Sequence, residues 1–166
     1  MKMKFILISV LVLILAACYN KADNTTELQR RIESLENNLK ESYKPGFGEF
    51  MSSIQSHHAK LWFAGQNKNW KLADFEIHEI MEAIDNIQKF ETDRKESQKI
   101  SMIMPAIDSV NYAIKNQDAS LFNRTYTILT NTCNNCHKSN EFEFNVVKIP
   151  EVSSFSNQDF RLNGTK

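Results

Sequence analysis

Two thiols and an imidazole stand close together near the C-terminal end of this chain. Cys133 and Cys136 are three positions apart, and His137 follows directly, in the run Cys-Asn-Asn-Cys-His. Two thiols at this spacing can each form a thioether with one of the two vinyl groups of a haem, and the adjacent histidine is then placed to ligate the iron. The run therefore predicts one covalently bound haem c, with His137 as the proximal iron ligand.

Two other interpretations of the same residues need different surroundings. A redox-active C-x-x-C pair usually opens a helix beside a strand–helix–strand pattern, which this sequence does not show. A zinc site on Cys133, Cys136 and His137 lacks a second cysteine pair, because the chain has only three cysteines. A haem-free lipoprotein that serves as an interaction or metal-binding module is the alternative that these interpretations leave open.

The N-terminus has the pattern of a bacterial export signal. Lys2 and Lys4 precede an apolar run from Phe5 to Leu15, which is too short for a mature membrane span. The run then ends in Leu-Ala-Ala-Cys18. Haem is attached to c-type proteins outside the bacterial cytoplasm, so an export signal and the haem motif agree with each other.

The residues around Cys18 resemble a lipobox, the signature of bacterial lipoproteins. The resemblance implies cleavage before Cys18, lipidation of Cys18, and a lipid anchor that holds the chain on a membrane of the cell envelope, on the periplasmic side. Tyr19 is not an Asp retention signal, which favours the outer membrane.

Composition limits the partners of the chain. The sequence has 20 basic and 20 acidic residues, and removal of residues 1–17 takes away two lysines, which leaves 18 against 20 and a formal charge of −2. Nucleic-acid binding normally needs a basic face, so no nucleic-acid partner is expected. We also expect no enzymatic activity, because no acid–base constellation with clear spacing is present. An unidentified redox partner protein is expected instead.

Apolar residues recur at steps of three and four through most of the chain, which predicts an all-α fold. A first helix over residues 25–41 has a seam of Leu28, Ile32, Leu35 and Leu39, typical of a spacer helix or of a short coiled coil that could form a homodimer. Four helices follow at about 48–64, 69–90, 99–116 and from Asp118, the expected N-cap, to the haem motif. Pro105 should kink or restart the third of these four.

These elements predict a four-helix bundle. Along the chain they define four segments. A lipoprotein signal peptide occupies residues 1–17, and a tether with a short coiled-coil-like helix occupies 18–44. The haem domain occupies 45–140, and an extended, irregular tail that could lie over the haem edge occupies 141–166.

The sixth iron ligand should come from the first bundle helix. In an up-down-up-down bundle, the start of this helix lies at the same end as His137. Met51 and His58 are seven residues apart on one face, so both are candidates. Met51 is nearer the expected level, because His58 should lie about 10 Å deeper at 1.5 Å of rise per residue.

The position of the motif on the last helix resembles the cytochrome c-prime family and its Met-ligated relatives over about residues 46–140. The chain is also similar to a group of bacterial lipoprotein cytochromes that share a Pro-Gly-Phe-Gly-Glu start at Pro45, a His-His-Ala-Lys-Leu-Trp-Phe-Ala-Gly stretch at His57, and a Ser-Asn-Gln-x-Phe tail ending at Phe160. This resemblance brings no defined activity with it. The C-x-x-C-H run and the export signal together predict a membrane-anchored monohaem c-type cytochrome for one-electron transfer. A five-coordinate haem protein that binds nitric oxide or carbon monoxide, as in cytochrome c-prime, is the second expectation.

Overall fold

The computed structural model describes residues 25–39 and 45–162 of the chain. All regular structure in these two ranges is helical, and they contain no strand, which confirms the predicted all-α class. The chain divides into two compact units, Met1–Lys44 and Pro45–Lys166. None of the helices within the described ranges combines the length and the apolar character that a membrane span requires.

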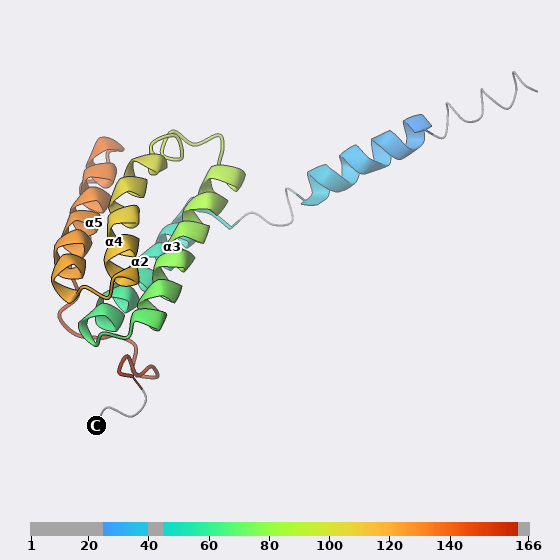
Figure 1. Ribbon diagram of the computed structural model, residues 1–166. Coiled ribbons are helices and arrows are strands. Elements are labelled where there is room, and N and C mark those ends of the chain that lie inside the picture. The colour runs from blue at the N-terminus through green and yellow to red at the C-terminus, as the bar shows by residue number, and fades with distance from the viewer. Residues whose placement is uncertain (1–24, 40–44, 163–166) are drawn as a thin grey trace, which may run out of the picture. The chain divides into compact units, whose positions relative to one another are not determined.

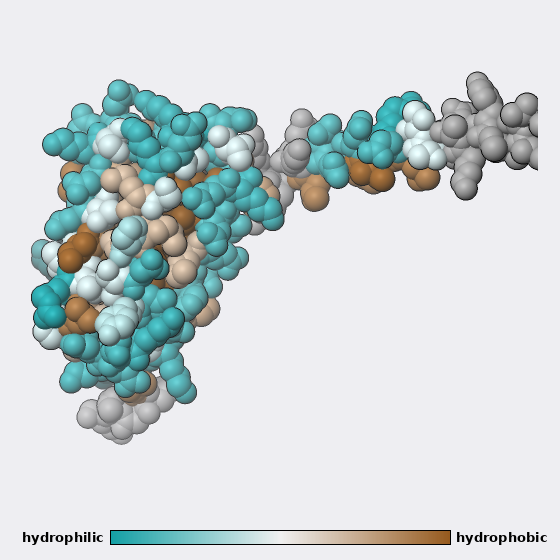
Figure 2. Space-filling model, turned by 45° about the horizontal axis from the view of Figure 1, so that its top comes forward, coloured by the Kyte–Doolittle hydropathy of each residue, from teal (hydrophilic) through white to brown (hydrophobic). Residues whose placement is uncertain are grey.

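The first unit contains a helix over residues 25–39, as the sequence predicts; residues 40 and 41 of the expected helix lie outside the described ranges. Leu28, Ile32 and Leu35 are exposed along this helix. Figure 2 shows these apolar side chains gathered along one side of the helix, with polar side chains along the other. The helix therefore carries the expected apolar seam within its own unit.

The second unit is built from helices α2 (Phe47–Gln66), α3 (Trp70–Phe90), α4 (Met104–Lys115) and α5 (Ala119–Ser139), with the short 3₁₀ helix η1 (Ile100–Ile103) before α4. The four α-helices lie side by side (Figure 1). Helix α2 packs mainly on α3, and α4 packs mainly on α5. Helices α2, α3 and α5 begin and end within one or two residues of the ranges expected from the sequence, whereas α4 ends one residue before the expected end and begins five residues after the expected start.

Side-chain caps explain two of these boundaries. Asn69 Oδ1 accepts a hydrogen bond from the Leu72 backbone N–H at 3.3 Å and begins α3. Asp118 Oδ1 accepts from the Leu121 N–H at 2.9 Å and begins α5, as predicted. Each cap satisfies one of the backbone donors that a helix N-terminus leaves without a partner.

Pro105 restarts the third helix of the unit rather than kinking it. The expected helix at 99–116 is divided into η1 and α4, and Pro105 lies in the first turn of α4. Proline is well tolerated there, because its missing N–H would have no intrahelical acceptor in the first turn.

The core is formed by aliphatic side chains of all four α-helices and by two aromatic rings of α5, Phe122 and Tyr126, which are fully buried. Helices α2 and α5 approach closely at Gly65: a Cβ added there would lie 2.1 Å from Phe122 Cε1. Trp62, one turn earlier, has its ring centroid 4.8 Å from that of Tyr126. The C-terminal half of α2 is thus tightly packed on the N-terminal half of α5.

The tail after α5 returns to the helices and is not a free extension. Phe160 is buried in the core, with its ring centroid 5.5 Å from that of Phe63 on α2. The Asn69 side-chain amide donates to the Phe160 carbonyl at 3.2 Å. These contacts give a physical reason for the phenylalanine that ends the Ser-Asn-Gln-x-Phe sequence.

Candidate functional site

The C-x-x-C-H run lies in the last two turns of α5. Cys133 and Cys136 are one helical turn apart and therefore share a face of the helix. Cys136 is buried and Cys133 is partly buried against the core. Both residues and His137 line one cavity of about 400 Å³. A cavity of this size is within the range of about 300–1,000 Å³ in which proteins bind small molecules and cofactors.

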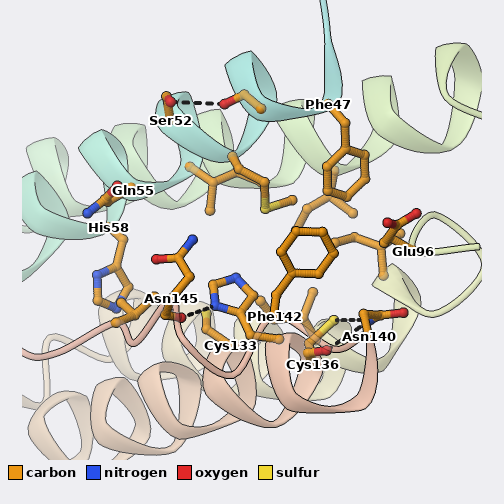
Figure 3. A pocket seen from close by; sticks show the side chains of 18 of the residues that line it. Phe47, Ser52, Gln55, His58, Glu96, Cys133, Cys136, Asn140, Phe142 and Asn145 are labelled. Carbon is orange, nitrogen blue, oxygen red and sulfur yellow. Dashed lines mark hydrogen bonds between the residues drawn. The ribbon is translucent and has the colours of Figure 1, made fainter. Parts of the chain in front are cut away.

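The cavity lies between α2 and α5, and its remaining walls come from α3, η1, the segment before η1 and the tail. Figure 3 shows Phe47, Ser52, Gln55 and His58 of α2 on one side and Cys133 and Cys136 of α5 on the other. Further wall residues are Gly48, Met51, Ile54, Ile84, Arg94, Glu96, Ile100, Ile103, His137, Asn140, Phe142, Asn145 and Val147. The structure thus brings all the site residues expected in the second unit to one cavity.

Met51 and His58, the two candidates for the sixth ligand, are in different chemical environments. His58 is 4 % exposed; its Nε2 lies 3.0 Å from Thr130 Oγ1, and its Nδ1 lies 3.0 Å from the Tyr126 hydroxyl. Burial lowers the pKa of His58 to about 4, so the ring is neutral at pH 7. Both ring nitrogens are therefore engaged with α5, whereas Met51 is partly buried on the cavity wall.

His137 is oriented by the tail. Its Nδ1 donates to the Asn145 backbone carbonyl at 2.6 Å, a contact that Figure 3 marks at Asn145. Because a neutral imidazole carries a single N–H, this bond leaves the lone pair on Nε2. A histidine that ligates a metal commonly donates its other ring N–H to a carbonyl or carboxylate in this way.

Asn134, the first variable residue of the motif, holds the tail on α5. Its side-chain amide donates to the Val147 carbonyl at 2.9 Å, and its Oδ1 accepts from the Val147 N–H at 2.8 Å. Phe142, Asn145 and Val147 consequently form part of the cavity wall. The sequence predicted that the tail at 141–166 could lie over the haem edge, but it did not single out these three residues as part of the site.

The two thiols are held in their protonated form. Burial, with a smaller contribution from the neighbouring Cys136, raises the pKa of Cys133 to about 12. Burial also raises the pKa of Cys136, although Asn140 and Lys99 oppose this shift. Redox-active C-x-x-C pairs and zinc ligands need thiolates, which helix N-termini favour. The C-x-x-C-H run lies at the C-terminal end of α5, where the helix dipole disfavours a thiolate.

Two polar features at the cavity wall bear on what it could hold. Asn140 donates to the Cys136 carbonyl at 2.8 Å, and its buried Oδ1 has no hydrogen-bond partner among the described residues. Arg94 lies over the Phe47 ring, 4.9 Å from the centroid, and its Nη2 is 3.2 Å from Glu96 Oε1. Arg94 thus provides a guanidinium at the wall, which suits a carboxylate of a bound group.

The described histidines outside the C-x-x-C-H run do not belong to a cluster of metal-ligating side chains. The Nδ1 of His57 on α2 lies 2.6 Å from the buried Glu76 carboxylate. Within the described ranges, no group of three or more His, Cys, Asp or Glu side chains is placed to hold a metal ion. Cys18, the predicted lipidation site, and the predicted signal peptide lie outside the described residues.

Comparison with known proteins gives no relative: no protein-family model, curated protein or solved structure matches this chain. The functional argument therefore rests on the cavity and the residues around it.

Proposed function

We propose that the chain is an exported, lipid-anchored monohaem c-type cytochrome that transfers single electrons. The Pro45–Lys166 unit would be a four-helix haem bundle, with Cys18 as the lipid anchor on the periplasmic side of a membrane in the cell envelope. The observation that carries the proposal is the convergence of Cys133, Cys136 and His137 on one cavity, with the Nδ1 of His137 already bonded to a carbonyl.

The residues of the cavity fit a covalent haem in three respects. Two protonated thiols are available to add to the two vinyl groups and form thioethers. The wall combines apolar side chains such as Ile84 and Ile103 with Arg94, which would hold a propionate. When bound, the haem would supply the one-electron chemistry, and the protein would supply position, axial ligation and burial.

We assign Met51 as the sixth ligand in preference to His58. To ligate, His58 would have to give up its bond to Thr130 or to Tyr126 and leave a buried polar group without a partner, which costs about 1–3 kcal/mol. A Met/His axial pair should give a low-spin iron and a raised reduction potential.

The test starts with the purified, matured protein. We expect haem peroxidase staining to survive boiling in detergent and to disappear in a Cys133→Ala, Cys136→Ala double variant. Staining that persists in this variant, or a parent without haem, would overturn the proposal and favour the haem-free module.

Absorption spectra then identify the distal ligand. Met51→Ala should lose the low-spin spectrum, and His58→Ala should keep it. Met81→Ala is the matched control, because Met81 is a partly buried methionine that packs on the core and is not a wall residue of the cavity. Loss of the spectrum only in His58→Ala would reverse the assignment. A high-spin parent that binds carbon monoxide directly would indicate a gas-binding haem protein instead.

A further inference from the structure

We infer that Asn134 is a positioning residue for the axial histidine: by clamping the tail at Val147, it holds the Asn145 carbonyl in place to accept the Nδ1 proton of His137. The inference rests on the proposed haem function, because it concerns how His137 is presented to the iron. It assigns a role to a variable position inside the C-x-x-C-H run, where the sequence motif itself specifies no residue type.

The contacts between Asn134 and Val147 form a two-point clamp. The donor and the acceptor of one side-chain amide meet the acceptor and the donor of one backbone residue, at 2.9 and 2.8 Å. Of the polar side chains, only an amide offers an N–H donor and a carbonyl acceptor in this fixed pairing. Asp at this position would keep one of the two bonds, and Ala would keep neither.

Two further backbone hydrogen bonds hold the segment between His137 and the clamp in place. The Phe142 N–H donates to the His137 carbonyl at 2.9 Å, and the Asn145 N–H donates to the Phe142 carbonyl at 2.9 Å. Asn145 thus lies between a turn anchored on α5 and the clamp at Val147, two residues further on. Its carbonyl is fixed from both sides at 2.6 Å from His137 Nδ1.

The clamp has a chemical consequence at the iron. A bond from Nδ1–H to a carbonyl makes the imidazole a stronger electron donor through Nε2 and fixes the plane of the ring. Stronger donation stabilises the ferric state, so the reduction potential is lowered while the clamp is intact. Release of the tail would weaken the Nδ1–H bond, raise the potential and allow the Nδ1 proton to exchange with solvent.

The experiment compares the matured parent with Asn134→Ala, and with Asn135→Ala as the control. Asn135 is the other variable residue of the motif and is exposed. Two quantities are measured: the reduction potential, and the solvent exchange of the His137 Nδ1 proton by NMR of the reduced protein. In Asn134→Ala we expect a higher potential and exchange that is about tenfold faster or more, the factor that corresponds to loss of one hydrogen bond. Asn135→Ala should match the parent in both.

Three further variants separate positioning from general stability. Val147→Pro removes the backbone N–H that Asn134 accepts, leaves the motif intact and should reproduce the shift of Asn134→Ala. Phe160→Ala loosens the tail at its core contact and should lower the melting temperature without changing the potential. Asn134→Gln retains the amide and should restore at least part of the parent behaviour.

The possible failures are distinguishable. If the parent carries no haem, the proposed function fails and this inference fails with it. If the parent carries haem, and Asn134→Ala and Val147→Pro keep the parent potential and Nδ1 exchange, only the positioning role is overturned. A shift in Phe160→Ala as large as that in Asn134→Ala would show that tail packing in general, and not the clamp, sets the potential.

Discussion

Replacement of Gly65 by alanine tests the close contact that sets the spacing of α2 and α5. A Cβ at position 65 would lie 2.1, 2.2 and 2.7 Å from three carbons of the Phe122 ring. Ordinary contact between carbons is about 3.5 Å, so the ring would have to retreat by about 1.4 Å. Phe122 is fully buried among side chains of the core and has no room for such a movement.

The expected change in the free energy of unfolding follows from two opposing effects of the added methyl group. Overpacking of a core costs about 1–3 kcal/mol, and a clash with a fully buried ring belongs at the upper end of that range. Alanine gains up to about 1 kcal/mol over glycine in a helix, and less in the last turn, where Gly65 lies. The net loss of unfolding free energy is therefore about 2 kcal/mol, which should lower the melting temperature by about 5–10 °C for a domain of this size.

The matched control is Gly48→Ala in the same helix. A Cβ at Gly48 meets no other atom within 4 Å, so only the gain in helix propensity remains and the melting temperature should stay equal or rise. Thermal unfolding followed by circular dichroism at 222 nm measures both variants. If Gly65→Ala were as stable as Gly48→Ala, α2 and α5 would not be in contact at Phe122, and the packing described for this end of the unit would be wrong.

Three more predictions concern other parts of the chain. Burial lowers the pKa of His58 to about 4 in the folded state, so on acidification the histidine is protonated first in the unfolded state. The contribution of His58 to the free energy of unfolding is therefore complete above the unfolded pKa of 6.5. Up to roughly 3 kcal/mol of it is lost as pH falls from 6.5 towards 4. His58→Gln should flatten this part of the stability profile, and an unchanged profile would contradict the assignment. Leu35→Glu tests the two interpretations of the helix at 25–39: as a coiled coil it would give a dimer that the substitution converts to a monomer in sedimentation equilibrium, whereas as a spacer helix it gives the same mass in the parent and the variant. Cys18→Ser should release the protein from the membrane fraction, and retention with an unchanged N-terminus would exclude lipidation.

Local patterns in the sequence were sufficient to predict the helices. The caps Asn69 and Asp118 act on backbone groups three residues away, and Pro105 acts on its own helical turn, so each effect is visible within a short window. The placement of Met51 and of the C-x-x-C-H run on facing helices followed from helix direction alone. For this reason, the candidate site could be placed at one end of the unit from the sequence.

The contacts that decide between the candidates depend on long-range packing and could not be predicted. His58 meets Tyr126 and Thr130, which are 68 and 72 positions away, and no periodicity in either helix indicates that the three polar groups meet. The clamp between Asn134 and Val147 joins α5 to a segment without regular structure. From the sequence alone, an asparagine inside the motif is as consistent with a solvated side chain as with a clamp on the tail, because the path of the tail is not known at that stage.

The position of the cavity follows from unequal packing along α2. At the Gly65 end, the missing side chain lets α2 come into contact with Phe122, and the Trp62 and Tyr126 rings fill the next layer. One further turn along, His58 bridges the helices through its hydrogen bonds to Tyr126 and Thr130. Beyond His58, Met51 of α2 and the two cysteines of α5 line the cavity, and the tail is bonded to His137 through the Asn145 carbonyl. Between α2 and α5, these ring contacts and hydrogen bonds extend from Gly65 to His58, and the cavity lies beyond them. In the proposed haem site, His58 would therefore close one end of the cavity, and Met51 would ligate the iron.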